Sequence, residues 1–290
     1  MRRRGRGGQF GVSGVYLREL ASTHDVGPGL SVSYSHGAKR RAGQLSAWLA
    51  KLQRGAVGPL APRSSVRLMV ADSADWHKVC AYPYGLPFTR NEPGLATVVV
   101  AADYPERFLK RFDDLLLAAG HAGVATPGPL VEFLDLLVGH EWGHAIANVS
   151  GLRTYLRWLD ELLATYLFVQ ALRTAGEESN LELLARWAEV QVAAGQEGSA
   201  AGWPLDGFEY PRGRTALPRL LWYQGVLTQR ALELSLTRGW DFPLELGGAL
   251  PTADRGELAR RLVAVEPSFK PWFAVFGDGS QASGEDQTSI

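Results

Sequence analysis

The chain has 290 residues, of which 46% are hydrophobic and only 21% are charged, so it can bury a substantial core and is not a disordered chain. Its 30 basic and 30 acidic residues balance, which excludes a global field that would draw it to nucleic acid or anionic lipid, and we expect a peptide or protein substrate. The lone Cys80 excludes an internal disulfide and a thiolate zinc cage.

A single domain is expected over residues 15–276, with a basic, flexible tail over residues 1–14 and a small, polar tail over residues 277–290. The basic start, at residues 2–6, is followed by small and polar residues rather than by the apolar run of a signal peptide. No uncharged apolar stretch reaches the roughly 20 residues that span a bilayer. These features predict a cytoplasmic protein without membrane contact.

The first part of the domain, residues 15–127, is expected to be an α/β lobe. Alternating apolar and polar residues predict a strand over 30–35, helical spacing predicts a helix over 38–53, and residues 66–71 are typical of a second strand. Residues 82–93 are rich in Gly and Pro and predict an irregular loop. The three valines in 96–102 indicate a well-buried strand. Together these segments predict a mixed sheet with flanking helices.

The second part, residues 128–276, is expected to be mainly helical. At the end of the first part a helix is predicted from Pro105 to Gly120, and the second part begins with a helix from Pro129 to Val149 that ends at the Ser150-Gly151 pair. Apolar periodicity continues the pattern over 154–174, 179–194, 216–236 and 253–264. The expected fold class is therefore α+β, with the sheet lobe packed on the helical lobe.

The segment His140-Glu141-Trp142-Gly143-His144 is the clearest chemical signal. Its two histidines are four residues apart inside a predicted helix, so their imidazoles share one face and can chelate one ion. A catalytic zinc site uses three protein ligands and leaves the fourth position open to water. Glu141 can project toward that position and act as a general base. The pattern predicts one Zn²⁺ per chain, bound by His140 and His144.

A simpler interpretation is a helix that carries two histidines by chance. With six histidines in the chain, an accidental match to this motif arises in roughly 1 in 100 sequences of this composition. The small residues Gly143 and Ala145 beside the second histidine favour close approach of another element or of a substrate. The metal interpretation is therefore the stronger of the two, and a metal-free helical protein is the alternative.

The next predicted helix contains Trp158-Leu159-Asp160-Glu161 and, further on, Ala164. The two helices together resemble the gluzincin metallopeptidases, in which a glutamate on the helix after the His-Glu-x-x-His helix completes the zinc site. The local pattern Trp-Leu-x-Glu-x-x-Ala is similar to that of the aminopeptidases related to leukotriene hydrolase. The resemblance is close over residues 130–170, and it implies Glu161 as third ligand and a zincin-like fold with an active-site cleft between the lobes.

Other zinc peptidase classes fit this chain less well. A metzincin would carry Gly at position 147 and His at position 150, where this chain has Ala147 and Ser150, and the Gly-Thr-x-Asp context of an aspzincin is missing. Asp160 is the competing acid, and both acids could instead merely face solvent. Because successive helix residues point about 100° apart, only one of them can face the histidines. We expect this to be Glu161, with Trp158 packed beside it against the metal helix.

Supporting residues are expected around the ligands. Asn148, one turn beyond His144, and Thr165, one turn beyond Glu161, are candidates to hydrogen-bond a ligand and fix its orientation, or are ordinary polar helix residues. The segment around Tyr223 resembles the Tyr-x-Lys-Gly region of the aminopeptidases, although the lysine is missing and the tyrosine is one residue too close to the glycine. Tyr223 is therefore the candidate to stabilise the oxyanion, with Tyr210 as the fallback and a core tyrosine as the alternative.

Gluzincins bind an extended substrate along the edge strand that precedes the metal helix, and Leu95 to Ala102 resembles that strand in position. No segment resembles the Gly-Ala-Met-Glu-Asn motif that binds a free amino terminus in the aminopeptidases, so exopeptidase activity is not supported. We expect zinc-dependent hydrolysis of a peptide bond with Glu141 as general base and then proton shuttle. The alternative is a catalytically inactive zinc-binding module that recognises partners or peptides.

Overall fold

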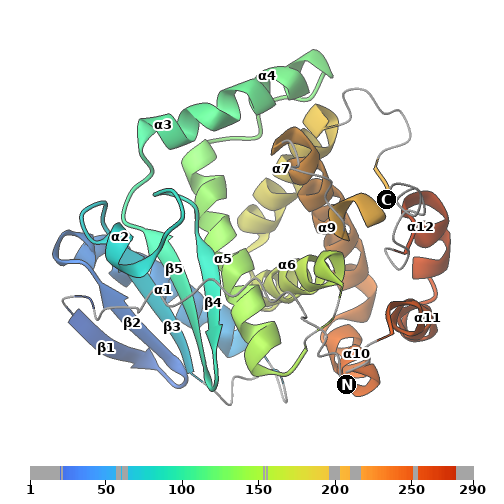
Figure 1. Ribbon diagram of the computed structural model, residues 1–290, viewed down its shortest axis with the longest axis horizontal. Coiled ribbons are helices and arrows are strands. Elements are labelled where there is room, and N and C mark those ends of the chain that lie inside the picture. Colours follow the sequence, from blue (N-terminus) through green and yellow to red (C-terminus); the bar gives the residue numbers. More distant parts are fainter. Residues whose placement is uncertain are drawn as a thin grey trace, which may run out of the picture.

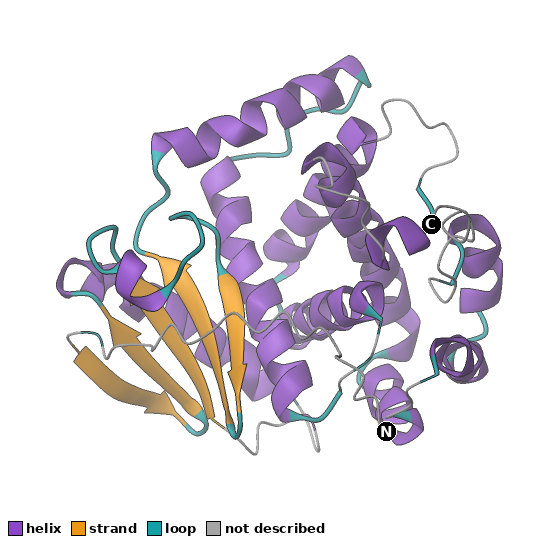
Figure 2. Cartoon of the chain, in the orientation of Figure 1, coloured by secondary structure: helices purple, strands orange, loops and turns teal. Residues whose placement is uncertain are grey.

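The computed structural model describes residues 20, 22–56, 60, 65–152, 154, 156–195, 203–209, 217–250 and 254–278. Over these residues it is an α+β fold, in which a mixed sheet is built from the first part of the chain and helices make up most of the remainder (Figures 1 and 2). The predicted fold class is confirmed at this level. Residues 1–14 and 279–290, where tails were predicted, lie outside the described residues. Among the described helices, none combines the length and apolar character needed to cross a bilayer.

The sheet has five strands in the order β1-β2-β3-β5-β4. Strands β2, β3 and β5 are parallel, whereas β1 and β4 pair antiparallel with β2 and β5 and form the two edges. The bounds are β1 Ser22–Gly27, β2 Leu30–Tyr34, β3 Ser65–Ala71, β4 Phe88–Glu92 and β5 Leu95–Ala101. The predicted strands at 30–35, 66–71 and 96–102 are therefore confirmed as the parallel centre of the sheet.

The edge strand next to the helical lobe is β4, which corrects two predictions. Its residues fall in the segment that was expected to be an irregular loop. Because β4 is the edge strand, residues 95–102 do not lie at the edge of the sheet, where they were predicted to be. The cause is a hairpin, because Pro93 and Gly94 form a two-residue connection in which Glu92 pairs with Leu95 and Gly94 has a φ of 73°. A proline followed by a left-handed glycine suits such a turn. Strand β5 lies in the interior, covered by β3 on one side and by β4 on the other.

The helices follow the predicted segments with some divisions. The helix expected from 105 to 120 is split into three short pieces, and α2, α8, α10 and α12 were not predicted. The bounds are η1 His36–Ala38, α1 Lys39–Gly55, α2 Trp76–Val79, α3 Glu106–Leu109, η3 Lys110–Phe112, α4 Asp113–His121, α5 Leu130–Val149, α6 Arg157–Thr174, α7 Glu178–Gly195, α8 Asp206–Glu209, α9 Leu217–Arg238, α10 Asp241–Ala249, α11 Arg255–Val265 and α12 Phe269–Phe276.

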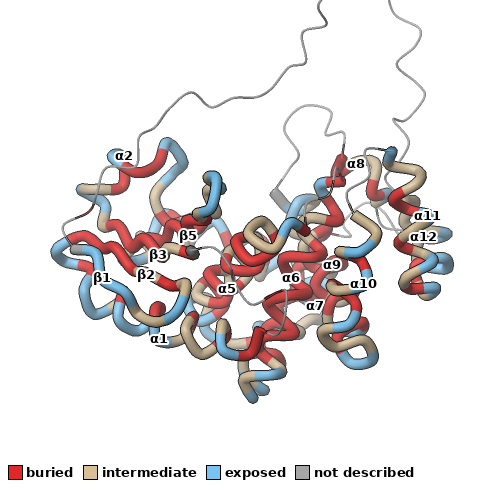
Figure 3. The backbone as a smooth tube through the Cα atoms, turned by 90° about the horizontal axis from the view of Figure 1, so that it is seen from below, coloured by how far each residue is buried: buried red, intermediate tan, exposed pale blue. Residues whose placement is uncertain are grey.

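Alternate residues of the central strands enter two separate cores, as the period of a strand requires. Leu68, Val98 and Val100 belong to the main core with α1, α5 and α6, whereas Met69 and Val99 belong to a smaller cluster with α2 on the opposite face. The strands are therefore covered on both faces. The buried stretches of the chain run through the sheet and on into α5, α6 and α9 (Figure 3).

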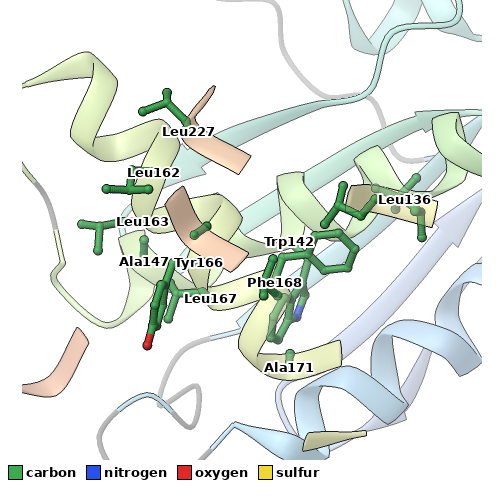
Figure 4. Packing of buried hydrophobic residues seen from close by; sticks show 14 of the residues in the cluster. Leu136, Trp142, Ala147, Leu162, Leu163, Tyr166, Leu167, Phe168, Ala171 and Leu227 are labelled. Carbon is green, nitrogen blue, oxygen red and sulfur yellow. The ribbon is translucent and has the colours of Figure 1, made fainter. Parts of the chain in front are cut away.

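Helix α5 connects the sheet to the helical lobe, because it contacts β4 and β5 on one side and α6 and α7 on the other (Figure 1). It ends as predicted at Ser150 and Gly151, where the N–H of Leu152 returns to the carbonyl of Ala147 at 2.8 Å and Gly151 has a φ of 75°. Side chains such as Trp142 of α5 and Phe168 of α6 fill the interior between the two helices (Figure 4). The predicted metal motif thus lies on a deeply packed helix.

Candidate metal centre

The structure brings His140, His144 and Glu161 together. Their ligand atoms lie within 4.8 Å of one another, in a part of the chain where α5 and α6 pack side by side. One oxygen, Oε2 of Glu161, lies 3.2 Å from Nε2 of His140 and 3.5 Å from Nε2 of His144. This is the donor set of two imidazoles and one carboxylate expected from the sequence.

The two distances from Glu161 to the histidines match two edges of a tetrahedral zinc site. Bonds of about 2.0–2.2 Å from zinc to nitrogen and oxygen place neighbouring ligand atoms of a tetrahedron roughly 3.3 Å apart. The two observed separations, 3.2 and 3.5 Å, bracket that value. The side chains of His140, His144 and Glu161 keep 15%, 22% and 25% of their surface exposed, so the cluster is not fully buried. The residues present therefore fit a metal ion such as zinc.

Thr165 fixes the orientation of His140. The hydroxyl of Thr165 donates to the carbonyl oxygen of Glu161 at 2.9 Å, so its oxygen is available to accept from Nδ1 of His140, which lies 3.1 Å away. A proton held on Nδ1 leaves the lone pair on Nε2, the nitrogen that faces Glu161. The predicted contact of Thr165 is therefore present, and it holds the His140 ring with Nε2 toward Glu161.

Two glycines of α5 let α6 approach closely enough to deliver Glu161. A Cβ at Gly143 would lie 2.1 Å from the carbonyl oxygen of Ala164, and one at Gly139 would lie 2.2 Å from the ring of Phe168. Contacts this short are impossible, so α6 occupies the space that a side chain would need. Gly143, the small residue beside His144, therefore allows α5 and α6 to pack closely, as the sequence indicated.

Gly143→Ala is expected to destabilise the protein by about 1–3 kcal/mol, the usual cost of overpacking. Because the obstructing atom belongs to the α6 backbone, α6 must shift as a whole and carry Glu161 away from the histidines. Thermal unfolding and zinc affinity measure the two effects. Gly43→Ala is the matched control, since Gly43 is exposed on α1 and an added Cβ would have nothing within 4 Å, and it should stabilise by up to about 1 kcal/mol. Equal behaviour of the two variants would contradict the packing account.

The electrostatics of the cluster favour a charged carboxylate at Glu161. Burial acts to raise its pKa, but hydrogen bonds and charge from His140 and His144 outweigh burial and hold the pKa well below the ordinary value. For His144, burial acts to lower the pKa, and the hydrogen bond and charge of Glu161 overcome it and raise the pKa to about 9. Glu161 is thus in the form that ligates a metal, and a metal ion must compete with the proton of His144.

Glu141 is half-buried on α5 beside the ligands. Burial is the largest influence on its carboxyl and raises the pKa, while the charges of His140 and His144 partly oppose the rise. Its backbone is held from the sheet side, since the hydroxyl of Thr89 on β4 donates to the carbonyl oxygen of Glu141 at 2.6 Å. A carboxyl with a raised pKa near a reacting centre suits a group that accepts and returns a proton.

The adjacent acid Asp160 points elsewhere, as expected. Its Oδ1 accepts from the backbone N–H of Thr154 at 3.1 Å and from the Thr154 hydroxyl at 2.8 Å, so it ties down the start of α6. Trp158 does not follow the prediction. It packs on α12, with ring centroids 5.7 Å from Trp272 and 5.8 Å from Phe273, because α12 covers that face of α6.

The role predicted for Tyr223 finds no support in the geometry, whereas the role predicted for Asn148 stays a prediction. The hydroxyl of Tyr223 donates to the carbonyl oxygen of Pro204 at 2.8 Å and accepts from Arg219 at 3.2 Å, and the ring is fully buried. These are the contacts of a core tyrosine rather than of an oxyanion donor. Asn148 is half-buried one turn beyond His144. Tyr210, the fallback, lies outside the described residues.

Sequence reasoning missed Thr89 and Gln224. Thr89 was hidden in the supposed loop before Pro93, although the proline-glycine pair that follows it is a turn signal. Gln224 is next to the favoured Tyr223, and its amide Nε2 donates to Oε2 of Glu161 at 2.9 Å. The signal that could have identified Gln224 is that it is a polar residue flanked by apolar residues in the predicted helix.

The sequence matches no protein-family model, and neither a curated protein nor a solved structure matches it.

Proposed function

We propose that the chain is a zinc-dependent hydrolase that cleaves peptide bonds, with a site of the gluzincin type. The observation that carries the proposal is the position of Glu161 Oε2, 3.2 and 3.5 Å from the two imidazole nitrogens of the His140-Glu141-x-x-His144 helix. Three ligands from two consecutive helices and partial exposure are the features of a catalytic zinc site. The zincin-like arrangement of the two lobes, with the cleft between them, is part of the same proposal.

In this mechanism His140, His144 and Glu161 would hold the ion, and the contact of Thr165 with Nδ1 would keep the ring of His140 turned with Nε2 toward Glu161. Zinc bound there supplies a Lewis acid and lowers the pKa of water to about 7. Glu141 accepts the proton that the attacking water loses and passes it to the leaving amine. Its raised pKa makes it a competent donor in the second half of that transfer.

Strand β4 is the surface proposed to receive the substrate. It is the edge of the sheet, it runs antiparallel to β5, and it lies against the metal helix through the hydrogen bond from Thr89 to Glu141. An extended peptide can pair with the open side of such a strand and so lie across the ligands. This assigns to β4 the role that the sequence had given to 95–102.

Incubation of the zinc-loaded protein with a mixture of unrelated peptides tests the function. The proposal expects new amino termini within the peptides, disappearance of cleavage after zinc is removed by a chelator, and its return when zinc is added back. A protein that retains stoichiometric zinc and cleaves none of the peptides would favour an inactive zinc-binding module instead.

A further inference from the structure

We propose that Gln224 is a positioning residue for the metal centre, which holds the carboxylate of Glu161 in the orientation that binds the ion. The inference rests on the proposed zinc site and extends it to a third helix. Gln224 lies on α9, some 60 residues beyond Glu161 in sequence, and its Nε2 donates to Oε2 of Glu161 at 2.9 Å. This is the same oxygen that faces both histidines.

A carboxylate oxygen has two lone pairs, so Oε2 can accept from Gln224 with one and ligate a metal with the other. Without a second contact, the Glu161 carboxylate could rotate about its terminal bond, because such sp² torsions are broad. The amide removes that freedom and selects Oε2 as ligand. Hydrogen bonds of this kind to a ligand orient it and commonly account for 10–100-fold in metal affinity.

The chemistry of an amide suits this position. A lysine or arginine here would place positive charge beside the metal ion, and an acid would repel Glu161. Glutamine donates a hydrogen bond without adding charge and keeps its donor at every pH at which the protein folds. Gln224 therefore supplies Glu161 with a neutral hydrogen-bond donor.

The packing of α9 holds Gln224 firmly in place. Its neighbours Tyr223 and Leu227 are fully buried, whereas Gln224 is half-buried and turned toward α6. At the next residue, a Cβ on Gly225 would lie 2.8 Å from the carbonyl oxygen of Ala188 and 3.0 Å from Cβ of Gln191, so α9 sits directly on α7 (Figure 1). A donor anchored in this way needs no rearrangement to meet Glu161.

The test compares Gln224→Met with Gln191→Met. Both replace a glutamine by an unbranched apolar residue of similar length, but Gln191 packs against α9 beside Gly225 without contacting Glu161. Zinc affinity is measured by competition with a chelator, and the ligand arrangement by the visible spectrum of the cobalt-substituted protein. Gln224→Met is expected to lose about 10–100-fold in zinc affinity and to change the cobalt spectrum, whereas Gln191→Met should keep both.

Unchanged zinc affinity in Gln224→Met, or an equal loss in Gln191→Met, would overturn the inference. If Gln224→Met does not fold, Gln224→Asn decides, because it keeps the amide but is one methylene too short, and parental affinity in it would refute the role. The readout is metal binding rather than turnover, so a parent that binds zinc but cleaves no peptide refutes the proposed hydrolysis alone. A parent that binds no zinc contradicts both.

Discussion

Glu141→Gln is expected to lower kcat for peptide hydrolysis by about 10²–10⁴-fold, the usual contribution of a general base, while the zinc content stays at the parental level. Glutamine has nearly the size and helix propensity of glutamate, so α5 and the ligands that flank position 141 should be undisturbed. Its amide cannot accept the proton of the attacking water. Loss of turnover with retention of metal would therefore separate the base from the ligands.

Glu132→Gln is the matched control for this variant, because it makes the same change at an exposed position in the first turn of the same helix. Its turnover and zinc content should equal those of the parent. Initial rates on a validated peptide and elemental analysis of each protein provide the comparison. Hydrolysis by Glu141→Gln at the parental rate would show that another group accepts the proton.

Glu161→Ala is expected to lose most of the zinc affinity and all activity, because removal of the carboxylate leaves only two imidazoles. Asp160→Ala should retain zinc. Asp160 has no hydrogen bond to the ligands and accepts instead from Thr154, so its removal should cost stability, about 1–3 kcal/mol for the donors left without a partner. The two substitutions should therefore have different effects: Glu161→Ala should impair metal binding, and Asp160→Ala should lower the stability of the fold.

Zinc titration by chelator competition, together with thermal unfolding of both variants, measures these outcomes. The adjacent positions make each variant the control for the other, since both shorten an acidic side chain near the start of α6. Loss of zinc in Asp160→Ala with retention in Glu161→Ala would overturn the assigned ligand set while leaving a metal protein possible.

The parallel strands and the long helices were predictable because their signals are local. The valines of β5 and the apolar spacing of α5 and α9 identify each segment without knowledge of its neighbours. Strand β4 was not predicted, since its residues are polar or half-buried at an edge and carry little periodic signal. Pro93 and Gly94 suggested irregular structure, although in that order they form the turn of a hairpin. Strand β1 was not predicted either, and Pro28 and Gly29 form the turn that joins it to β2.

Within the site, the sequence predicted what one helix or two adjacent helices determine. The spacing of His140 and His144 places both rings on one face of α5, and the likeness of the next helix to gluzincins pointed to Glu161. The contribution of Gln224 depends on the rotation of α9 about its own axis, which is set by its contacts with α6 and α7. This rotation turns Gln224, rather than Tyr223, toward Glu161. No feature of the local sequence determines the rotation.

The metal content of the purified protein tests the central claim most directly. After growth and purification in zinc-containing, chelator-free buffer, elemental analysis should find about one zinc per chain, because two imidazoles on one helix and a carboxylate held by its neighbour are already arranged for chelation. Metal content near zero under the same conditions would contradict the claim.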